Sequence, residues 1–156
     1  MAVTGQVLGW VNIAVTVLLG ALIGVLVAVA SSHSSYTSLN AGDCFNPVGS
    51  GIFASLVTKK PCSEPHLDEA VGAFDLTATS WPGATGVRVE AQPECSTLAT
   101  QYVGQVSTAG LQLVWFYPSR ASFDGGTRKV VCSVRNADGT KRTGSLRSGL
   151  GPTSSG

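Results

Sequence analysis

No charged side chain occurs before Asp43 in this chain of 156 residues. Asp, Glu, Lys and Arg together make up only 12% of the sequence, and the formal net charge is +1. The basic residues are scattered from Lys59 onward, without the clustered positive charge that attracts nucleic acid. We therefore expect no nucleic-acid partner.

The sequence also lacks the short motifs that carry catalysis or bind cofactors. It contains no Cys-x-x-Cys pair, no Cys-x-x-Cys-His haem signal and no Gly-x-Ser-x-Gly elbow. The densest polar stretch is 62–69 (CSEPHLDE), where Cys62 and His66 supply two of the four Cys or His ligands of a structural zinc site. Two ligands are too few for such a zinc site. A hydrolase would need a nucleophile beside His66, and the sequence has no nucleophile motif of the Gly-x-Ser-x-Gly kind. We instead expect His66 and Glu69 to have structural or binding roles, and we expect no enzyme activity, metal or cofactor.

One long apolar run does occur, from Val7 to Ala30. About 20 apolar residues in a helix cross the ~30 Å hydrocarbon core of a bilayer. A cleaved signal peptide is the alternative, with Ala28-Val29-Ala30 as a cleavage pattern. The absence of a basic n-region and the length of the run argue against cleavage. We predict that residues 1–30 form a transmembrane anchor, flanked by the aromatic residues Trp10 and Tyr36.

Small and polar residues recur on one face of this predicted helix. Their spacing of three or four residues matches the helical repeat, and two of the intervals are Gly-x-x-x-Gly. Such stripes let helices pack closely in lipid, although Gly is common in membrane helices in any case. The stripe predicts a partner helix and consists of Gly5, Gly9, Asn12, Thr16, Gly20 and Gly24.

All four cysteines, Cys44, Cys62, Cys95 and Cys132, follow the apolar run. An even number of widely spaced cysteines in a small domain suggests disulfides formed in an oxidising compartment. This predicts a cell-membrane protein with a cytoplasmic N-terminus and an extracytoplasmic, periplasmic-side C-terminal domain. Four cysteines allow three pairings. We predict Cys44–Cys62, which flank the first outer strand, and Cys95–Cys132, which would join a helix to the last strong strand.

The rest of the chain reads as a Ser-rich tether (31–40), a folded domain (41–146) and a flexible tail (147–156). Apolar patterning and turn residues predict strands at 52–58, 69–79, 111–117 and 129–135, with a hairpin connection at 119–126. Residues 83–104 read as a helical region that Pro93 breaks or restarts. Strands followed by a helical region and then by further strands predict an α+β domain with a mainly antiparallel sheet and one or two helices.

Several motifs in this region resemble, in order, those of one family. They are Ala41-Gly42-Asp43-Cys44-Phe45, Pro61-Cys62-Ser63-x-Pro65-His66-x-x-Glu69, Trp81-Pro82-Gly83, Cys95, Phe116-Tyr117-Pro118, Gly126-x-Arg128-x-Val130-Val131-Cys132 and Thr143-Gly144-Ser145-Leu146. Together they are similar to the septum-formation domain of actinobacterial membrane proteins over residues 41–146. The resemblance implies a link to cell division and no catalytic chemistry.

These observations predict a non-catalytic, single-pass accessory subunit of a larger membrane complex. The chain would bind other membrane proteins through its helix and outer domain, and the lipid bilayer would surround the helix. The complex is either a cell-division assembly or a respiratory, energy-converting one. A membrane-anchored sensor or binding module for an envelope ligand is the alternative.

Overall fold

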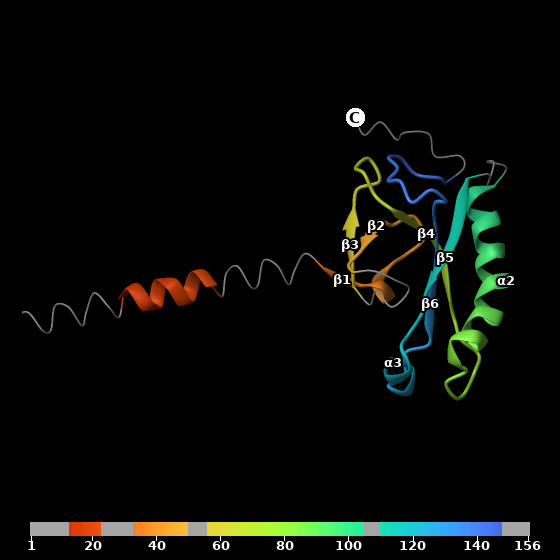
Figure 1. Cartoon of the computed structure of the whole chain (residues 1–156), viewed down its shortest axis with the longest axis horizontal. Coiled ribbons are helices and arrows are strands. Elements are labelled where there is room, and N and C mark those ends of the chain that lie inside the picture. The colour runs from red at the N-terminus through yellow and green to blue at the C-terminus, as the bar shows by residue number, and fades with distance from the viewer. Residues whose placement is uncertain (1–12, 23–32, 50–55, 105–109, 148–156) are drawn as a thin grey trace, which may run out of the picture. The chain divides into compact units, whose positions relative to one another are not determined.

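The computed structural model describes residues 13–22, 33–49, 56–104 and 110–147 (Figure 1). The chain divides into two units, Met1–His33 and Ser34–Gly156. In the first unit, residues 13–22 form a helix. None of the helices in the described ranges is both long and apolar enough to cross a membrane. Most of the predicted anchor lies outside those ranges, so the anchor remains a prediction.

The second unit is built on one antiparallel sheet with the strand order β1-β3-β2-β4-β6-β5. The predicted α+β fold with a mainly antiparallel sheet is therefore confirmed. The strands are β1 (Ser34–Ser35), β2 (Cys44–Pro47), β3 (Leu56–Lys60), β4 (Asp68–Asp75), β5 (Leu111–Phe116) and β6 (Lys129–Asn136). The predicted strand at 52–58 lies partly outside the described residues, and its described part begins at Leu56.

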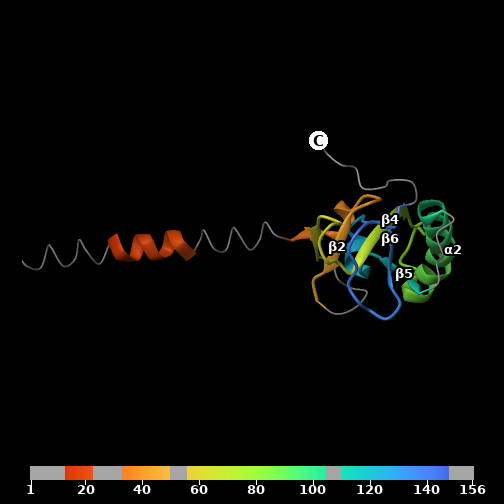
Figure 2. The ribbon, with the colours of Figure 1, turned by 90° about the horizontal axis from the view of Figure 1, so that it is seen from above.

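Helix α2 (Gly83–Val103) covers one face of the sheet, over β4, β6 and β5 (Figures 1 and 2). Side chains alternate across a strand, so Leu111, Leu113 and Trp115 of β5 pack on the α2 side. The buried core on this side also contains Val87, Ala91, Cys95 and Val103 of α2 and Val130, Cys132 and Val134 of β6.

A second core lies on the opposite face of the same sheet, under the 3₁₀ helix η1 (Tyr36–Ser38). The rings of Phe45 and Phe116 meet there edge to face, with centroids 5.5 Å apart. Tyr36 and Leu39 are buried beside them. The middle of the sheet is thus covered on both faces, which explains how β6 buries five consecutive residues, from Val130 to Val134.

Both predicted disulfides are confirmed, Cys44–Cys62 and Cys95–Cys132. The first joins β2 to Cys62, the second residue after the end of β3. The second joins α2 to the middle of β6, so it fastens the helix covalently to the sheet that it covers.

The predicted break at Pro93 is wrong, because α2 runs through this residue without interruption. Proline cannot donate to the carbonyl four residues earlier, which here belongs to Val89. Val89 is 71% exposed, so water can hydrate that carbonyl in place of the missing bond. Pro93 itself also faces solvent, and its own carbonyl accepts a hydrogen bond from Thr97 Oγ1 at 3.0 Å.

Two other segments differ from expectation. Residues 34–40 are folded rather than part of a tether, because β1 pairs with β3 and the chain then buries Tyr36 and Leu39 in the second core. Tyr36 is therefore not an exposed interfacial residue. The predicted hairpin connection between β5 and β6 contains a short helix, α3 (Arg120–Asp124), whose first turn is capped by the Ser119 hydroxyl.

Candidate functional site

Two adjacent carboxylates, Asp68 and Glu69, are completely buried at the start of β4. Neighbouring residues in a strand point to opposite faces of the sheet. Glu69 therefore lies on the α2 side and Asp68 on the other. A buried carboxylate is unfavourable unless it is paired or hydrogen-bonded, so the partners of each residue define what this region of the domain does.

Glu69 connects three parts of the domain through its two oxygens. Oε1 accepts hydrogen bonds from the hydroxyl of Tyr102 on α2, at 2.7 Å, and from the hydroxyl of Ser145. Oε2 accepts a hydrogen bond from the backbone N–H of Leu146 at 2.8 Å. The carboxylate thereby holds the C-terminal segment 145–146 against β4 and the end of α2.

Tyr102 remains a donor over the whole physiological range. Burial, supported by the neighbouring Glu69 and opposed by the Ser145 hydrogen bond, raises the pKa of the Tyr102 phenol to about 12. The Arg147 guanidinium lies over the Tyr102 ring, 5.8 Å from its centroid, and extends the attachment of the C-terminal segment.

Asp68 forms a bidentate ion pair with Arg135 on the opposite face of the sheet. Arg135 Nε lies 2.9 Å from Oδ1 and Nη2 lies 2.7 Å from Oδ2, and the Ser133 hydroxyl donates to Oδ1 at 3.2 Å. The two residues are direct partners in the β4–β6 register. Burial raises the pKa of Asp68, and the Arg135 hydrogen bonds and charge oppose that rise.

His66 is also completely buried, just before β4. Its Nδ1 donates to the carbonyl of Glu64 at 2.8 Å, and its backbone pairs with Arg142 in both directions, at 3.0 and 2.9 Å. No described residue hydrogen-bonds to its Nε2, nor to the buried Nε and Nη1 of Arg142. The prediction that His66 fixes the local turn agrees with the Glu64 contact, and Arg142 is its partner from the distant C-terminal segment.

The chemistry of these side chains does not favour a metal centre. Cys44 Sγ, one ring nitrogen of His66 and one oxygen of Glu69 lie within 4.8 Å of one another. Cys44, however, is bonded to Cys62 and offers no thiolate, while both Glu69 oxygens already accept hydrogen bonds. Among the described contacts, no hydroxyl or thiol is hydrogen-bonded to His66 as a nucleophile would be.

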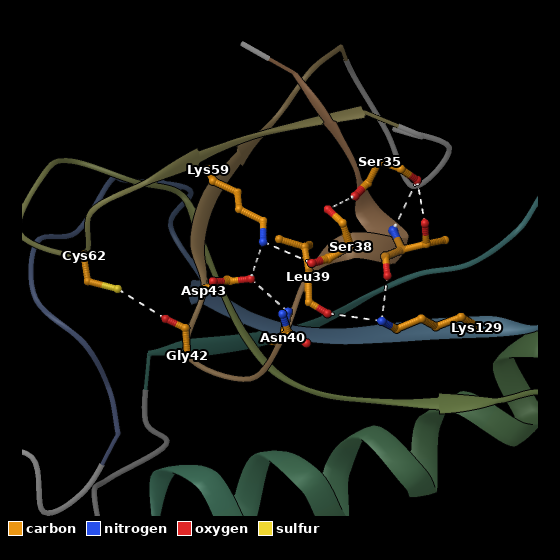
Figure 3. A network of polar contacts seen from close by, with 10 residues as sticks. Ser35, Ser38, Leu39, Asn40, Gly42, Asp43, Lys59, Cys62 and Lys129 are labelled. Atoms are coloured by element: carbon orange, nitrogen blue, oxygen red, sulfur yellow. Dashed lines mark hydrogen bonds and ion pairs between the residues drawn. The ribbon is translucent and has the colours of Figure 1, made fainter. Parts of the chain in front are cut away.

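A second polar network fastens the start of the sheet domain (residues 34–147), and Figure 3 shows it. Lys59 Nζ donates to Asp43 Oδ2 at 2.7 Å and to the Ser38 carbonyl at 3.0 Å. Lys129 Nζ donates to the carbonyls of Thr37 and Leu39, at 2.7 and 3.2 Å. Two lysines from β3 and β6 therefore hold the segment 37–43 in place.

The electrostatics of this network centre on Asp43. Burial acts to raise the pKa of Asp43, but hydrogen bonds from Lys59 and the Asn40 N–H outweigh burial and lower it. The Lys59–Asp43 pair is about one-third exposed, so it stabilises the fold by only about 0.2–1 kcal/mol. The sulfur of Cys62 lies 3.5 Å from the Gly42 carbonyl. This is a packing contact, because a disulfide has no S–H to donate.

Sequence reasoning found part of this site. The sequence indicated His66 and Glu69. It did not indicate the ion pair of Asp68 with Arg135, nor the roles of Tyr102 and Ser145 as partners of Glu69. The available signal was a pair of acidic residues, Asp68-Glu69, opening an apolar strand. Of the predicted helix-packing stripe, Thr16 and Gly20 lie in the described helix 13–22, and Gly5, Gly9, Asn12 and Gly24 lie outside the described residues.

A family model described as "Septum formation" matches residues 20–143, which is most of the chain. No curated protein and no solved structure matches significantly. The matched region contains both disulfides, His66, Asp68 and Glu69, and it ends just before Ser145 and Leu146. The chain therefore belongs to the septum-formation family.

Proposed function

We propose that this chain is a non-catalytic, single-pass membrane protein that serves as an accessory subunit of a larger assembly acting in cell division. Membership in the septum-formation family supports the link to division over a respiratory complex. The anchor would lie in the bilayer, and the outer domain would contact other membrane proteins on the extracytoplasmic side.

The observation that carries this proposal is the aliphatic surface of the helix at residues 13–22. Its exposed side chains include Val17, Leu18 and Leu22, at 65%, 69% and 61% exposure. Each large aliphatic side chain gains about 1.5–3 kcal/mol when it leaves water. A helix with such an exposed aliphatic surface needs lipid or another helix around it, and the apolar sequence continues on both sides to Val7 and Ala30.

Gly20 supports a partner helix within the membrane. A Cβ built at Gly20 meets no atom within 4 Å, so this position leaves room for the backbone of another helix to approach. Thr16 lies one helical turn before it on the same face.

The outer domain supports a binding role rather than a catalytic one. Its buried carboxylates hold structural elements together: Glu69 joins β4, α2 and segment 145–146, and Asp68 joins β4 to β6. Two disulfides further fix this framework. A rigid domain that follows a membrane anchor along the chain is suited to presenting a surface to a partner.

The test is co-purification of the tagged full-length chain in mild detergent, with mass spectrometry and imaging of a fluorescent fusion. We expect membrane-bound division proteins in the eluate and fluorescence at the division septum. A chain that purifies alone and is distributed evenly would refute the proposal. Saturable binding of an envelope glycan by that isolated chain would favour a sensor instead.

Orientation is tested separately by cysteine accessibility. A cysteine introduced at Ser148 should react with a membrane-impermeant maleimide in intact cells, and one introduced at Ala2 only after lysis. Reaction of Ala2→Cys in intact cells would place the N-terminus outside and refute the orientation.

A further inference from the structure

The two edges of the sheet differ in how they are protected. Strand β1 at one edge has only two residues, both serine, and such short edges resist pairing with other chains. Strand β5 at the other edge has six residues, LQLVWF, with no charge and no proline. Its register with β6 is continuous over all six pairs, without a bulge. Strand β5 is therefore neither short nor bulged, and it has no charge or proline to prevent edge pairing.

The outer edge of β5 presents hydrogen-bonding groups as well as apolar side chains. In an antiparallel ladder, alternate residues bond to the neighbouring strand and the others turn their N–H and C=O outward. No strand in the described part of the chain pairs with this outer edge. Leu111, Leu113, Val114 and Trp115 are all only partly buried, so a further strand would cover apolar surface as well as satisfy the backbone.

A hollow beside this edge adds a positive charge. It has a volume of about 320 Å³ and lies between the first turns of α2 and strand β5. Ala84, Thr85 and Arg88 line it from α2, and Leu113, Trp115 and Tyr117 line it from β5 and the residue after it. Arg88 is exposed and forms no ion pair with any described residue. The first turn of α2 contains no acidic residue, so nothing there neutralises the local positive potential.

We propose that β5 binds an extended segment of a partner protein, which adds a strand to the sheet and places an Asp or Glu side chain against Arg88. Backbone hydrogen bonds provide affinity in this mode of recognition, and pockets for alternate side chains provide specificity. A second copy of this chain fits less well, because β5 has no Asp or Glu to set against Arg88. This inference rests on the proposed accessory role and names how the outer domain docks.

The test is selection of displayed random octapeptides on the full-length chain in lipid nanodiscs. We expect enriched sequences that alternate apolar and polar residues and contain Asp or Glu. The affinity of these peptides, measured by fluorescence polarisation, should fall at least tenfold with Arg88→Glu. Close charge pairs in an interface contribute about 1.5 kcal/mol or more, which is roughly tenfold in affinity. A new selection on R88E should enrich Lys or Arg instead. Lys60→Glu makes the same charge change on β3, across the sheet, and should alter binding less than twofold.

Hydrogen exchange then distinguishes strand addition from other modes. Bound peptide should slow exchange at alternate residues of β5 only, as the outward N–H groups become paired. Absence of enrichment, or an unchanged preference in R88E, would overturn the inference. A dimer detected by sedimentation, with the same protection of β5 from hydrogen exchange in the absence of peptide, would also overturn it. The β5 edge would then be occupied by a second copy of this chain. A chain that co-purifies with division proteins but binds no peptide would refute this inference alone. Peptide binding by a chain that has no membrane partners would refute the proposed function alone.

Discussion

Replacing Glu69 with alanine tests how far the folded sheet domain depends on one buried carboxylate. The substitution removes the acceptor for Tyr102 O–H, Ser145 O–H and Leu146 N–H. A buried donor left without a partner costs about 1–3 kcal/mol. Ser145 is exposed and can turn to water, whereas the bonds from Tyr102 and Leu146 are buried, and Tyr102 retains only a long contact of 3.5 Å with Ser145 Oγ. Two buried donors therefore predict a loss of about 2–6 kcal/mol in the free energy of unfolding.

The assay is urea unfolding at neutral pH, with both disulfides intact and tryptophan fluorescence as the signal. Glu64→Ala is the matched control, because the one ion pair of this carboxylate among the described residues is with the exposed Lys60, at 3.0 Å. It should change the unfolding free energy by no more than about 0.5 kcal/mol. Tyr102→Phe removes a single donor and leaves Glu69 two others, so we expect a smaller loss, of about 1 kcal/mol.

A local measurement separates release of the C-terminal segment from a general loss of stability. In the wild type, Glu69 holds residues 145–146. In Glu69→Ala, trypsin should cleave after Arg147 and Arg142 faster than the global unfolding rate allows, and in Glu64→Ala it should not. If Glu69→Ala costs less than about 1 kcal/mol, or leaves these cleavages unchanged, the carboxylate does not have the linking role argued from its contacts.

Further predictions concern the Asp68–Arg135 ion pair, a disulfide, the proposed membrane helix and alkaline pH. Arg135→Ala leaves Asp68 buried without its partner and should cost about 3–5 kcal/mol, whereas the exposed Arg120→Ala should cost almost nothing. Arg135 opposes the rise that burial causes in the pKa of Asp68, so its removal should raise that pKa further and let the buried carboxyl bind a proton more readily. The loss in unfolding free energy caused by Arg135→Ala should therefore be smallest below about pH 4 and grow as pH rises. A loss that does not change with pH would contradict this. Replacing Cys95 and Cys132 with alanine opens a bridge spanning 37 residues and should lower the free energy of unfolding in urea by about 4 kcal/mol. Replacing Gly20 and Gly24 with leucine should reduce co-purification with the partner without impairing membrane insertion, whereas Ala21→Leu, off the stripe, should not. Finally, burial raises the pKa of Tyr36 and Tyr102 to about 12, so stability should fall between about pH 10 and 12; tyrosine absorbance that titrates near pH 10 in the folded chain would refute this.

Local sequence was sufficient for much of the fold because each strand's pattern reflects its burial. Strands β5 and β6 lie close to their predicted ranges, since runs of apolar and β-branched residues suit a sheet covered on both faces. The disulfide pairing also followed, because Cys95 and Cys132 were assigned to elements that an α+β domain must bring together. The helix region was located correctly, but the effect of Pro93 depended on Val89 facing solvent, which no local pattern reveals.

By itself, the sequence determined the apolar N-terminal stretch, the α+β domain and the two cysteine pairs, because hydrophobic patterning and cysteine placement are local properties of the chain. Tertiary structure decided how the polar residues are used. The β4–β6 register sets Arg135 opposite Asp68, and a return of the chain 77 residues later brings Leu146 to Glu69. Tertiary structure also decided that residues 34–40 belong to the sheet and its second core. Partners so distant in sequence are chosen by register and packing, which arise only when the whole domain has folded.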